Sequence, residues 1–205
     1  AFGLIDADQP VLCGDVVRFE GDKVALLIAE SAEVAEAAAK MVKVVYEDLP
    51  AILDTEAALS DSPGRVHADL PNLMLHVPIH RGDVDAAFAE ADVIVEEDFS
   101  TVWQEHAYLQ PEAGISYVDE QGRLVVETAG QWLHEDRRQI AAMLKLPEEQ
   151  VVIRYATIGG AFGGREDLSV QHVLGLAAWT LHQRGDGRTV SLVWERHESI
   201  IGHHK

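Results

Sequence analysis

The chain has only one cysteine, Cys13, among its 205 residues. It cannot form an internal disulfide, and it lacks the several cysteine ligands that an iron–sulfur cluster needs. Basic residues are also scarce, because 16 Lys and Arg stand against 35 Asp and Glu and leave a formal net charge of −19. This acidity argues against binding to nucleic acid or to an anionic membrane surface, since both require a basic face.

Long apolar runs are missing as well. No stretch is apolar enough over a sufficient length to predict a transmembrane helix, and the first residues do not form the basic segment and apolar run of a secretory signal. A reducing, cytoplasmic location fits the lone cysteine. The chain begins with Ala1 rather than Met, so we expect that an upstream segment is missing.

The first part of the chain, residues 1–59, has the pattern of a small α/β unit. The expected elements are, in order, strands at 15–19 and 23–30 with a turn at Gly21-Asp22, a helix at 31–42 with Ser31 as its N-cap, and a strand at 42–47. Residues 60–91 follow as a linker, in which proline, glycine and small polar residues predict irregular structure. One short helix is expected there from Val84, with Asp83 as its cap.

The second part, residues 92–205, mixes strands with two long helices. The expected strands are 93–103, 114–118, 124–128, 151–158 and 189–194, and the expected helices are 135–146 and 168–183. Asp119–Gly122 has the composition of a hairpin turn between two of these strands. The whole pattern predicts an α+β fold.

A glycine-rich segment at 157–167 lies between the strand that ends near Ile158 and the last long helix. Its glycines fit neither the dinucleotide fingerprint nor the phosphate loop, in which Arg165 and Glu166 would replace the required Lys and Ser/Thr. The order strand, glycine loop, helix is a common way to hold an anionic cofactor against backbone N–H groups. A purely structural turn, with Phe162 filling the core, is the alternative.

Three segments together are more specific than the glycine segment alone. Residues 103–112, 127–132 and 157–167 resemble, in order and separation, the molybdenum hydroxylase family of xanthine dehydrogenases and aldehyde oxidases. The likeness is greatest to the molybdenum-binding subunit of bacterial xanthine dehydrogenases. It implies that the chain is an N-terminal fragment of the molybdopterin-binding large subunit. The fold would then be a partial α/β hammerhead domain at 1–59, the linker, and the first part of the molybdopterin-binding α/β domain at 92–205.

The resemblance also implies roles for single residues. Gln131 matches the glutamine that hydrogen-bonds the apical oxo ligand of molybdenum without ligating the metal, while Gly160, Phe162 and Gly163 match positions facing the cofactor. Glu166 matches the acidic residue that hydrogen-bonds the purine in xanthine dehydrogenases. From the residues alone, the alternative for Gln131 is an amide that caps the following helix, and Glu166 is equally a first-turn charge stabilised by the helix dipole.

Acid–base chemistry has weak candidates in this chain. Glu105, His106 and Glu112 lie near a predicted strand end, where structural hydrogen bonds are the favoured interpretation. In the family the catalytic base is a glutamate far downstream, which would lie beyond Lys205. We therefore expect no catalytic residue within these residues and no turnover by the chain alone.

The implied activity is the hydroxylation of a purine such as xanthine or hypoxanthine, or of a related N-heterocycle, with water as the oxygen source. The implied cofactor is molybdopterin in its cytosine dinucleotide form. A 2Fe-2S centre and FAD would lie on partner domains or subunits, and the remainder of the large subunit would complete the site. The alternatives are an aldehyde- or carbon monoxide-oxidising member of the family, and a non-catalytic assembly or interaction module with the same fold.

Overall fold

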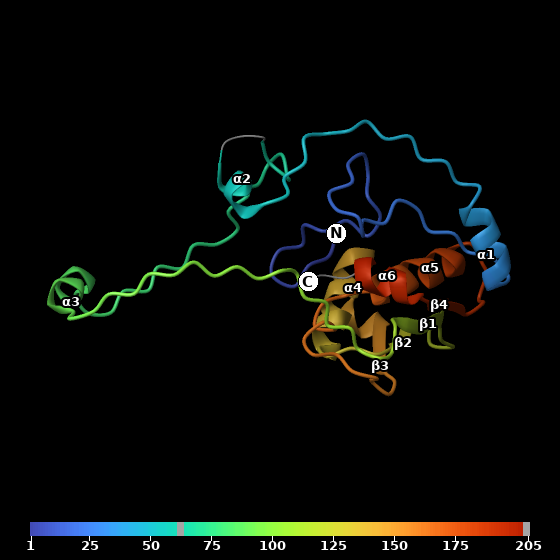
Figure 1. The fold of residues 1–205 in the computed structure, drawn as a ribbon. Coiled ribbons are helices and arrows are strands. Elements are labelled where there is room, and N and C mark those ends of the chain that lie inside the picture. The colour runs from blue at the N-terminus through green and yellow to red at the C-terminus, as the bar shows by residue number, and fades with distance from the viewer. Residues whose placement is uncertain (61–63, 203–205) are drawn as a thin grey trace. The chain divides into compact units, whose positions relative to one another are not determined.

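The computed structural model describes residues 1–60 and 64–202. By its contacts the chain divides into two units, one made of Ala1–Val42 together with Trp103–Lys205, and the other of Lys43–Val102. The first unit contains the sheet and the helices α1 (Ala32–Ala39), α4 (Leu133–Leu144), α5 (Gln171–Gln183) and α6 (Arg196–Gly202) (Figure 1). It also contains every segment that carries the family resemblance in the second part of the chain.

A four-stranded mixed sheet organises the first unit. Its strands are β1 (Ala113–Val118), β2 (Leu124–Thr128), β3 (Val151–Tyr155) and β4 (Val190–Val193), in the order β3-β2-β1-β4. β1 pairs antiparallel with both β2 and β4, whereas β2 and β3 are parallel. The predicted hairpin between β1 and β2 is confirmed, and Gly122 takes the positive φ of 76° that its turn requires.

Two helices, α4 (Leu133–Leu144) and α5 (Gln171–Gln183), contact the sheet and each other. The core consists of aliphatic side chains that alternate along β2 and β3 and meet the helices: Leu124, Val126, Ile140, Ala141, Val151, Ile153, Leu174, Ala177 and Ala178. A short 3-10 helix, η1 (Glu148–Gln150), leads into β3, and α6 (Arg196–Gly202) follows β4.

Both long helices begin at other residues than predicted. α4 begins two residues before the expected 135, and it ends where Lys145 adopts a left-handed conformation with φ 58°. α5 begins three residues after the expected 168. The reason is local, because the Gln171 side-chain oxygen accepts from the amides of Ser169 and Val170 and holds them outside the helix.

The strands predicted at 15–19, 23–30, 42–47 and 93–103 are wrong for this structure. None of these segments lies in a named strand, and Phe2–Gln9 is the only β-bridge among the described residues before β1. A strand needs a neighbouring backbone for its N–H and C=O groups, and an alternating sequence does not supply one. The turn at Gly21-Asp22 does form, since the Asp22 amide donates to the Phe19 carbonyl at 3.1 Å.

The helix caps predicted before the second part are confirmed. α1 (Ala32–Ala39) has Ser31 as its N-cap and α3 (Val84–Glu90) has Asp83, and each cap side chain accepts from the third amide that follows it. α2 (Thr55–Leu59), capped by Asp54, was not expected from the sequence. The described helices are too short or too polar to cross a membrane.

Candidate functional site

The two segments singled out by sequence leave the same edge of the sheet. β2 and β3 run parallel with Thr128 opposite Tyr155, so their carboxyl ends lie side by side. The Ala156 amide then donates to the Thr128 carbonyl at 2.8 Å and extends this pairing. Gln131 follows β2 and the glycine segment follows β3. Such an edge is where open α/β sheets hold ligands.

Gln131 is hydrogen-bonded to the end of the glycine segment. Its backbone amide donates to the Arg165 carbonyl at 3.0 Å, and its side-chain oxygen accepts from the Arg165 amide at 3.1 Å. The helix-cap interpretation of Gln131 is therefore wrong, and α4 starts after Trp132 with no side-chain cap. Within the described residues the side-chain amide Nε2 of Gln131 donates no hydrogen bond, and it is the part of the side chain available to a ligand.

Three glycines of the segment are required by the neighbouring residues 106–110. A Cβ on Gly159 would lie 2.5 Å from Cβ of Gln110, and one on Gly164 would lie 2.8 Å from the His106 ring. Gly160 has φ +102° and approaches Tyr108 equally closely. Gly159 and Gln110 also exchange hydrogen bonds, of 2.7 Å to the Gln110 side chain and 3.2 Å between backbones. One face of the glycine segment thus packs against residues 106–110.

The other face of the segment is open. Phe162 is 77% exposed, with a positive φ of 52°, so its interpretation as a core plug is wrong. Gly163 has φ +90°, and a Cβ there would meet nothing within 4 Å. Within the described residues, the amides of 160–163 donate no hydrogen bond. Successive free amides in a loop with left-handed residues form a concave site for anionic atoms.

Arg165 holds the segment in this shape from within the protein. Its side chain is 1% exposed, and its guanidinium donates to the carbonyls of Gly160, at 3.1 Å, and of Gln110. The guanidinium carbon also lies 4.1 Å from the centre of the Tyr108 ring. Sequence reasoning gave Arg165 no such role, although a cation directly after a glycine run was a usable signal.

Glu112 makes the structural contacts that the sequence favoured over acid–base work. Its side chain is fully buried and accepts from the Tyr108 hydroxyl, while its carbonyl accepts from the Trp194 amide at 2.8 Å. Burial and the Glu112 carboxylate raise the pKa of Tyr108 well above its ordinary value. Tyr108 therefore stays protonated and available to Arg165 as a neutral ring.

Glu166 is half-buried and precedes α5 by several residues. Its amide donates to the Gly163 carbonyl at 3.4 Å, and the first turn of α5 contains no acidic residue. The helix-dipole interpretation of Glu166 is therefore wrong, because that effect acts only within the first turn. The carboxylate remains a candidate for contact with a substrate beside the glycine segment.

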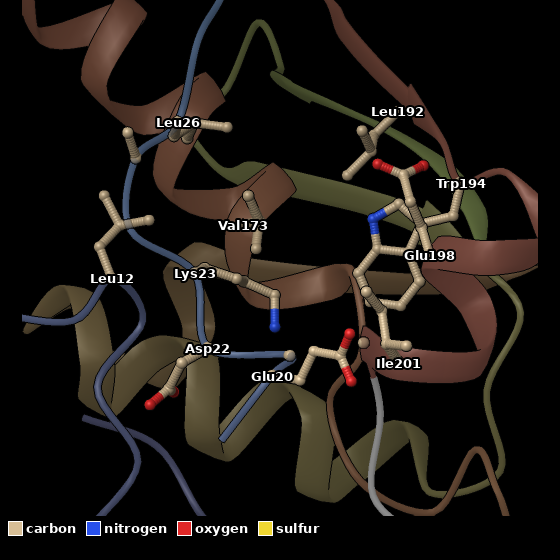
Figure 2. Close-up of a pocket in the computed structure, with 13 residues that line it drawn as sticks. Leu12, Glu20, Asp22, Lys23, Leu26, Val173, Leu192, Trp194, Glu198 and Ile201 are labelled. Carbon is tan, nitrogen blue, oxygen red and sulfur yellow. The ribbon is translucent and has the colours of Figure 1, made fainter. Parts of the chain in front are cut away.

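A cavity of about 300 Å³ lies elsewhere in the same unit (Figure 2). Its lining includes none of the residues of the Gln131 and glycine segments: Leu12, Glu20, Gly21, Asp22, Lys23, Ala25, Leu26, Val173, Leu192, Trp194, Glu198, Ile201 and Gly202. The Lys23 ammonium points into it, 5.6 Å from the centre of the Trp194 ring, and burial lowers the pKa of Lys23. We assign the candidate site to the sheet edge, where the convergent polar groups lie.

Family models match nearly the whole chain. The molybdopterin cofactor-binding domain matches residues 66–205, and the a/b hammerhead domain of aldehyde oxidase and xanthine dehydrogenase matches residues 2–50. The hammerhead resemblance of the first part is thereby confirmed, although its expected strands do not form here. The boundaries at 59 and 91 stay predictions.

Known proteins agree with these matches. The chain is 39% identical over 198 residues to the nicotinate dehydrogenase large molybdopterin subunit of Eubacterium barkeri, covering 97% of this chain and 45% of that protein. It is 34% identical over 199 residues to a probable xanthine dehydrogenase subunit of Bacillus subtilis (strain 168), covering 97% of this chain and 26% of that protein.

The fold is similar to that of the aldehyde oxidoreductase from Desulfovibrio gigas, with a TM-score of 0.90 and 31% identity over 96% of this chain and 21% of that one. The chain thus spans less than half the length of each of these three relatives. The family matches cover the sheet edge, Gln131 and the glycine segment alike. The chain belongs to the molybdenum hydroxylase family of xanthine dehydrogenases and aldehyde oxidases, and it contains the molybdopterin cofactor-binding domain of that family.

Proposed function

We propose that this chain forms part of a molybdenum hydroxylase that oxidises a purine or a related N-heterocycle, with water as the oxygen source. The observation that carries the proposal is the open face of the glycine segment. There the free amides of 160–163 lie on the same sheet edge as Gln131, whose Nε2 has no partner among the described residues.

The residues present fit molybdopterin. The cofactor carries anionic groups, and the unpaired amides of Gly160, Phe162 and Gly163 suit them, while the space beside Gly163 admits a ligand directly onto the backbone. When bound, the cofactor supplies the two-electron redox chemistry at its molybdenum. Gln131 would donate through Nε2 to the metal's oxo ligand.

The residues of this chain would hold the cofactor and orient it. Arg165 fixes the glycine segment from its buried side, so that the amides do not have to reorganise when the cofactor binds. Gln131 is held by two hydrogen bonds to Arg165, which use its backbone amide and its side-chain oxygen and leave Nε2 for a ligand. No residue described here is proposed as the catalytic base. We expect that base in a part of the protein that corresponds to the rest of the relatives' chains.

The substrate proposal rests on Glu166. A carboxylate beside the cofactor loop is suited to hydrogen-bond the N–H groups of a purine or another electron-poor N-heterocycle. Two of the similar proteins are named a nicotinate dehydrogenase and a probable xanthine dehydrogenase, and both names refer to N-heterocycles. An aldehyde substrate is the second candidate, favoured by the similarity to an aldehyde oxidoreductase of known structure.

Partners complete the proposal. Several relatives are named as subunits of larger assemblies. We propose that the remainder of a large subunit closes the site, that the cofactor is the cytosine dinucleotide form, and that 2Fe-2S and FAD components remove the electrons. We expect these 205 residues alone to be inactive.

The test is metal content together with substrate oxidation. The intact protein, purified with its partner chains, should contain about one molybdenum per chain and oxidise xanthine or nicotinate faster than an aldehyde. Gln131→Ala should lower oxidation strongly, whereas Gln121→Ala, in the exposed β1–β2 turn, should not. An intact complex that forms normally but contains no molybdenum would instead support the assembly-module alternative.

A further inference from the structure

The buried carboxylate of Asp136 connects the Gln131 segment (residues 129–132) with the glycine segment (residues 157–167), together the two cofactor segments. Asp136 lies on α4, and it is fully buried. Its Oδ2 accepts a 2.7 Å hydrogen bond from the Tyr155 hydroxyl and a 3.2 Å hydrogen bond from the Gln171 side-chain amide. Among the described residues, Asp136 has no Lys, Arg or His partner in an ion pair.

The three side chains come from the points where the cofactor segments begin and end. Tyr155 is the last residue of β3, two residues before the glycine segment, and Gln171 is the first residue of α5, four residues after it. Asp136 lies five residues after Gln131, in the first turn of α4. A single carboxylate oxygen therefore joins the entry and the exit of the glycine segment to the helix that Gln131 precedes.

Tyr155 also contacts the Gln131 segment directly. A Cβ on Gly130 would lie 2.5 Å from both the hydroxyl oxygen and the adjoining ring carbon of Tyr155, so the hydroxyl end of this ring packs against the Gly130 backbone. The other end of the network is equally constrained, since Gln171 accepts from the amides of Ser169 and Val170 at 2.9 Å each. Movement of any of these three side chains would shift a cofactor segment.

A buried carboxylate without a neighbouring cation adds little to the stability of the folded state. Desolvation raises the pKa of Asp136 to about 7, in spite of the two hydrogen bonds that favour its charged form. Packed apolar side chains commonly match or exceed buried charged groups in stability. The geometry thus favours a different role, which is to fix the distance between two separate loops.

We propose that Asp136, Tyr155 and Gln171 act as positioning residues that set the placement of Gln131 relative to the glycine segment, and thereby the retention of the molybdenum cofactor. The cofactor part of this inference rests on the proposed function. The positioning of the two segments does not rest on the proposed function, because amide exchange in the segments themselves measures it.

The experiment compares four variants of the intact protein, purified with its partner chains. Asp136→Ala and Tyr155→Phe each remove hydrogen bonds of the network, whereas Asp136→Asn retains an oxygen that accepts from both partners. Ser116→Ala is the matched control, since it removes a buried hydrogen bond of 2.8 Å to the Val125 carbonyl in the same sheet. Amide hydrogen exchange in residues 129–132 and 157–167 and molybdenum per chain are measured for each.

Asp136→Ala and Tyr155→Phe should speed exchange of the hydrogen-bonded amides in both segments, such as those of Gln131, Gly159 and Arg165, by about tenfold or more, as the loss of a buried hydrogen bond to a carboxylate implies. Molybdenum content should fall in the same variants, and Asp136→Asn should restore both measurements. Unchanged exchange in Asp136→Ala would overturn the proposal, and so would equal effects in Ser116→Ala at matched melting temperature. Wild-type protein without molybdenum would count against the proposed function alone, because the exchange measurement would still decide the positioning.

Discussion

Replacement of Asp136 by Asn should make the protein more stable, and more so as the pH rises. The pKa of Asp136 is raised from 3.8 to about 7 in the folded protein, chiefly by desolvation and further by the nearby carboxylates of Asp167 and Glu135. The folded state therefore binds this proton more tightly than the unfolded state does. Such a group contributes its full stability below about pH 4 and loses it as the pH rises to about 7.

The size of this stability difference follows from the difference between the pKa values of Asp136 in the unfolded and folded states. A difference of about 3 pKa units, at about 1.4 kcal/mol per unit, corresponds to about 4 kcal/mol of stability lost on charging Asp136. The side chain introduced by Asp136→Asn does not titrate, and its oxygen can still accept from Tyr155 and Gln171. The free energy of unfolding of Asp136→Asn minus that of wild type should thus rise by about 1.4 kcal/mol per pH unit from pH 5 to pH 7 and then level off.

Urea unfolding of wild type and variant in parallel, followed by tryptophan fluorescence at half-unit steps from about pH 5 to pH 8, measures this difference. The other carboxylates titrate in both proteins and cancel in the subtraction. A stability difference that stays constant within about 0.5 kcal/mol across this range would refute the reasoning, because a carboxylate that titrates alike in both states carries no linkage.

Three other substitutions test the rest of the site. Arg165→Lys should speed amide exchange in residues 157–167 by about tenfold, because an ammonium cannot reproduce two directed hydrogen bonds and the ring contact of a guanidinium. Gly164→Ala should lower the urea midpoint markedly, since its Cβ would lie 2.8 Å from the His106 ring. Gly122→Ala is the control, because its Cβ meets nothing and it should cost only about 1–2 kcal/mol of left-handed strain. Glu166→Gln in the intact protein should slow purine oxidation more than aldehyde oxidation, and equal slowing would argue against contact with the purine.

Local sequence pattern predicted the strands that precede the two candidate segments, while the role of these segments in cofactor binding stays a prediction. Gln131 and the glycine segment each follow a strand, and these strands proved to be parallel neighbours, so the two segments meet at one edge. The hairpin and the caps at Ser31 and Asp83 also followed from residue type, because their hydrogen bonds involve only nearby residues.

The rest depended on contacts between distant residues. The strands expected at 15–19 and 23–30 lack a paired neighbour in the described structure, and an apolar run cannot show whether one exists. The orientation of Phe162 could not be read from its type, since the same aromatic suits a core and an exposed loop tip. Sequence reasoning assigned no role to Asp136, because its burial and its hydrogen bonds to Tyr155 and Gln171 depend on residues that are distant in the chain.

The paired hydrogen bonds between Gln131 and Arg165 have an entropic consequence. Both segments are already held to each other, and to the sheet, without any ligand. Fixing a flexible backbone residue costs about 1–2 kcal/mol, and a loop that is ordered beforehand avoids that cost when the ligand arrives. We therefore expect the Gln131 segment and the glycine segment to bind the cofactor after the domain has folded, because neither segment has to become ordered on binding.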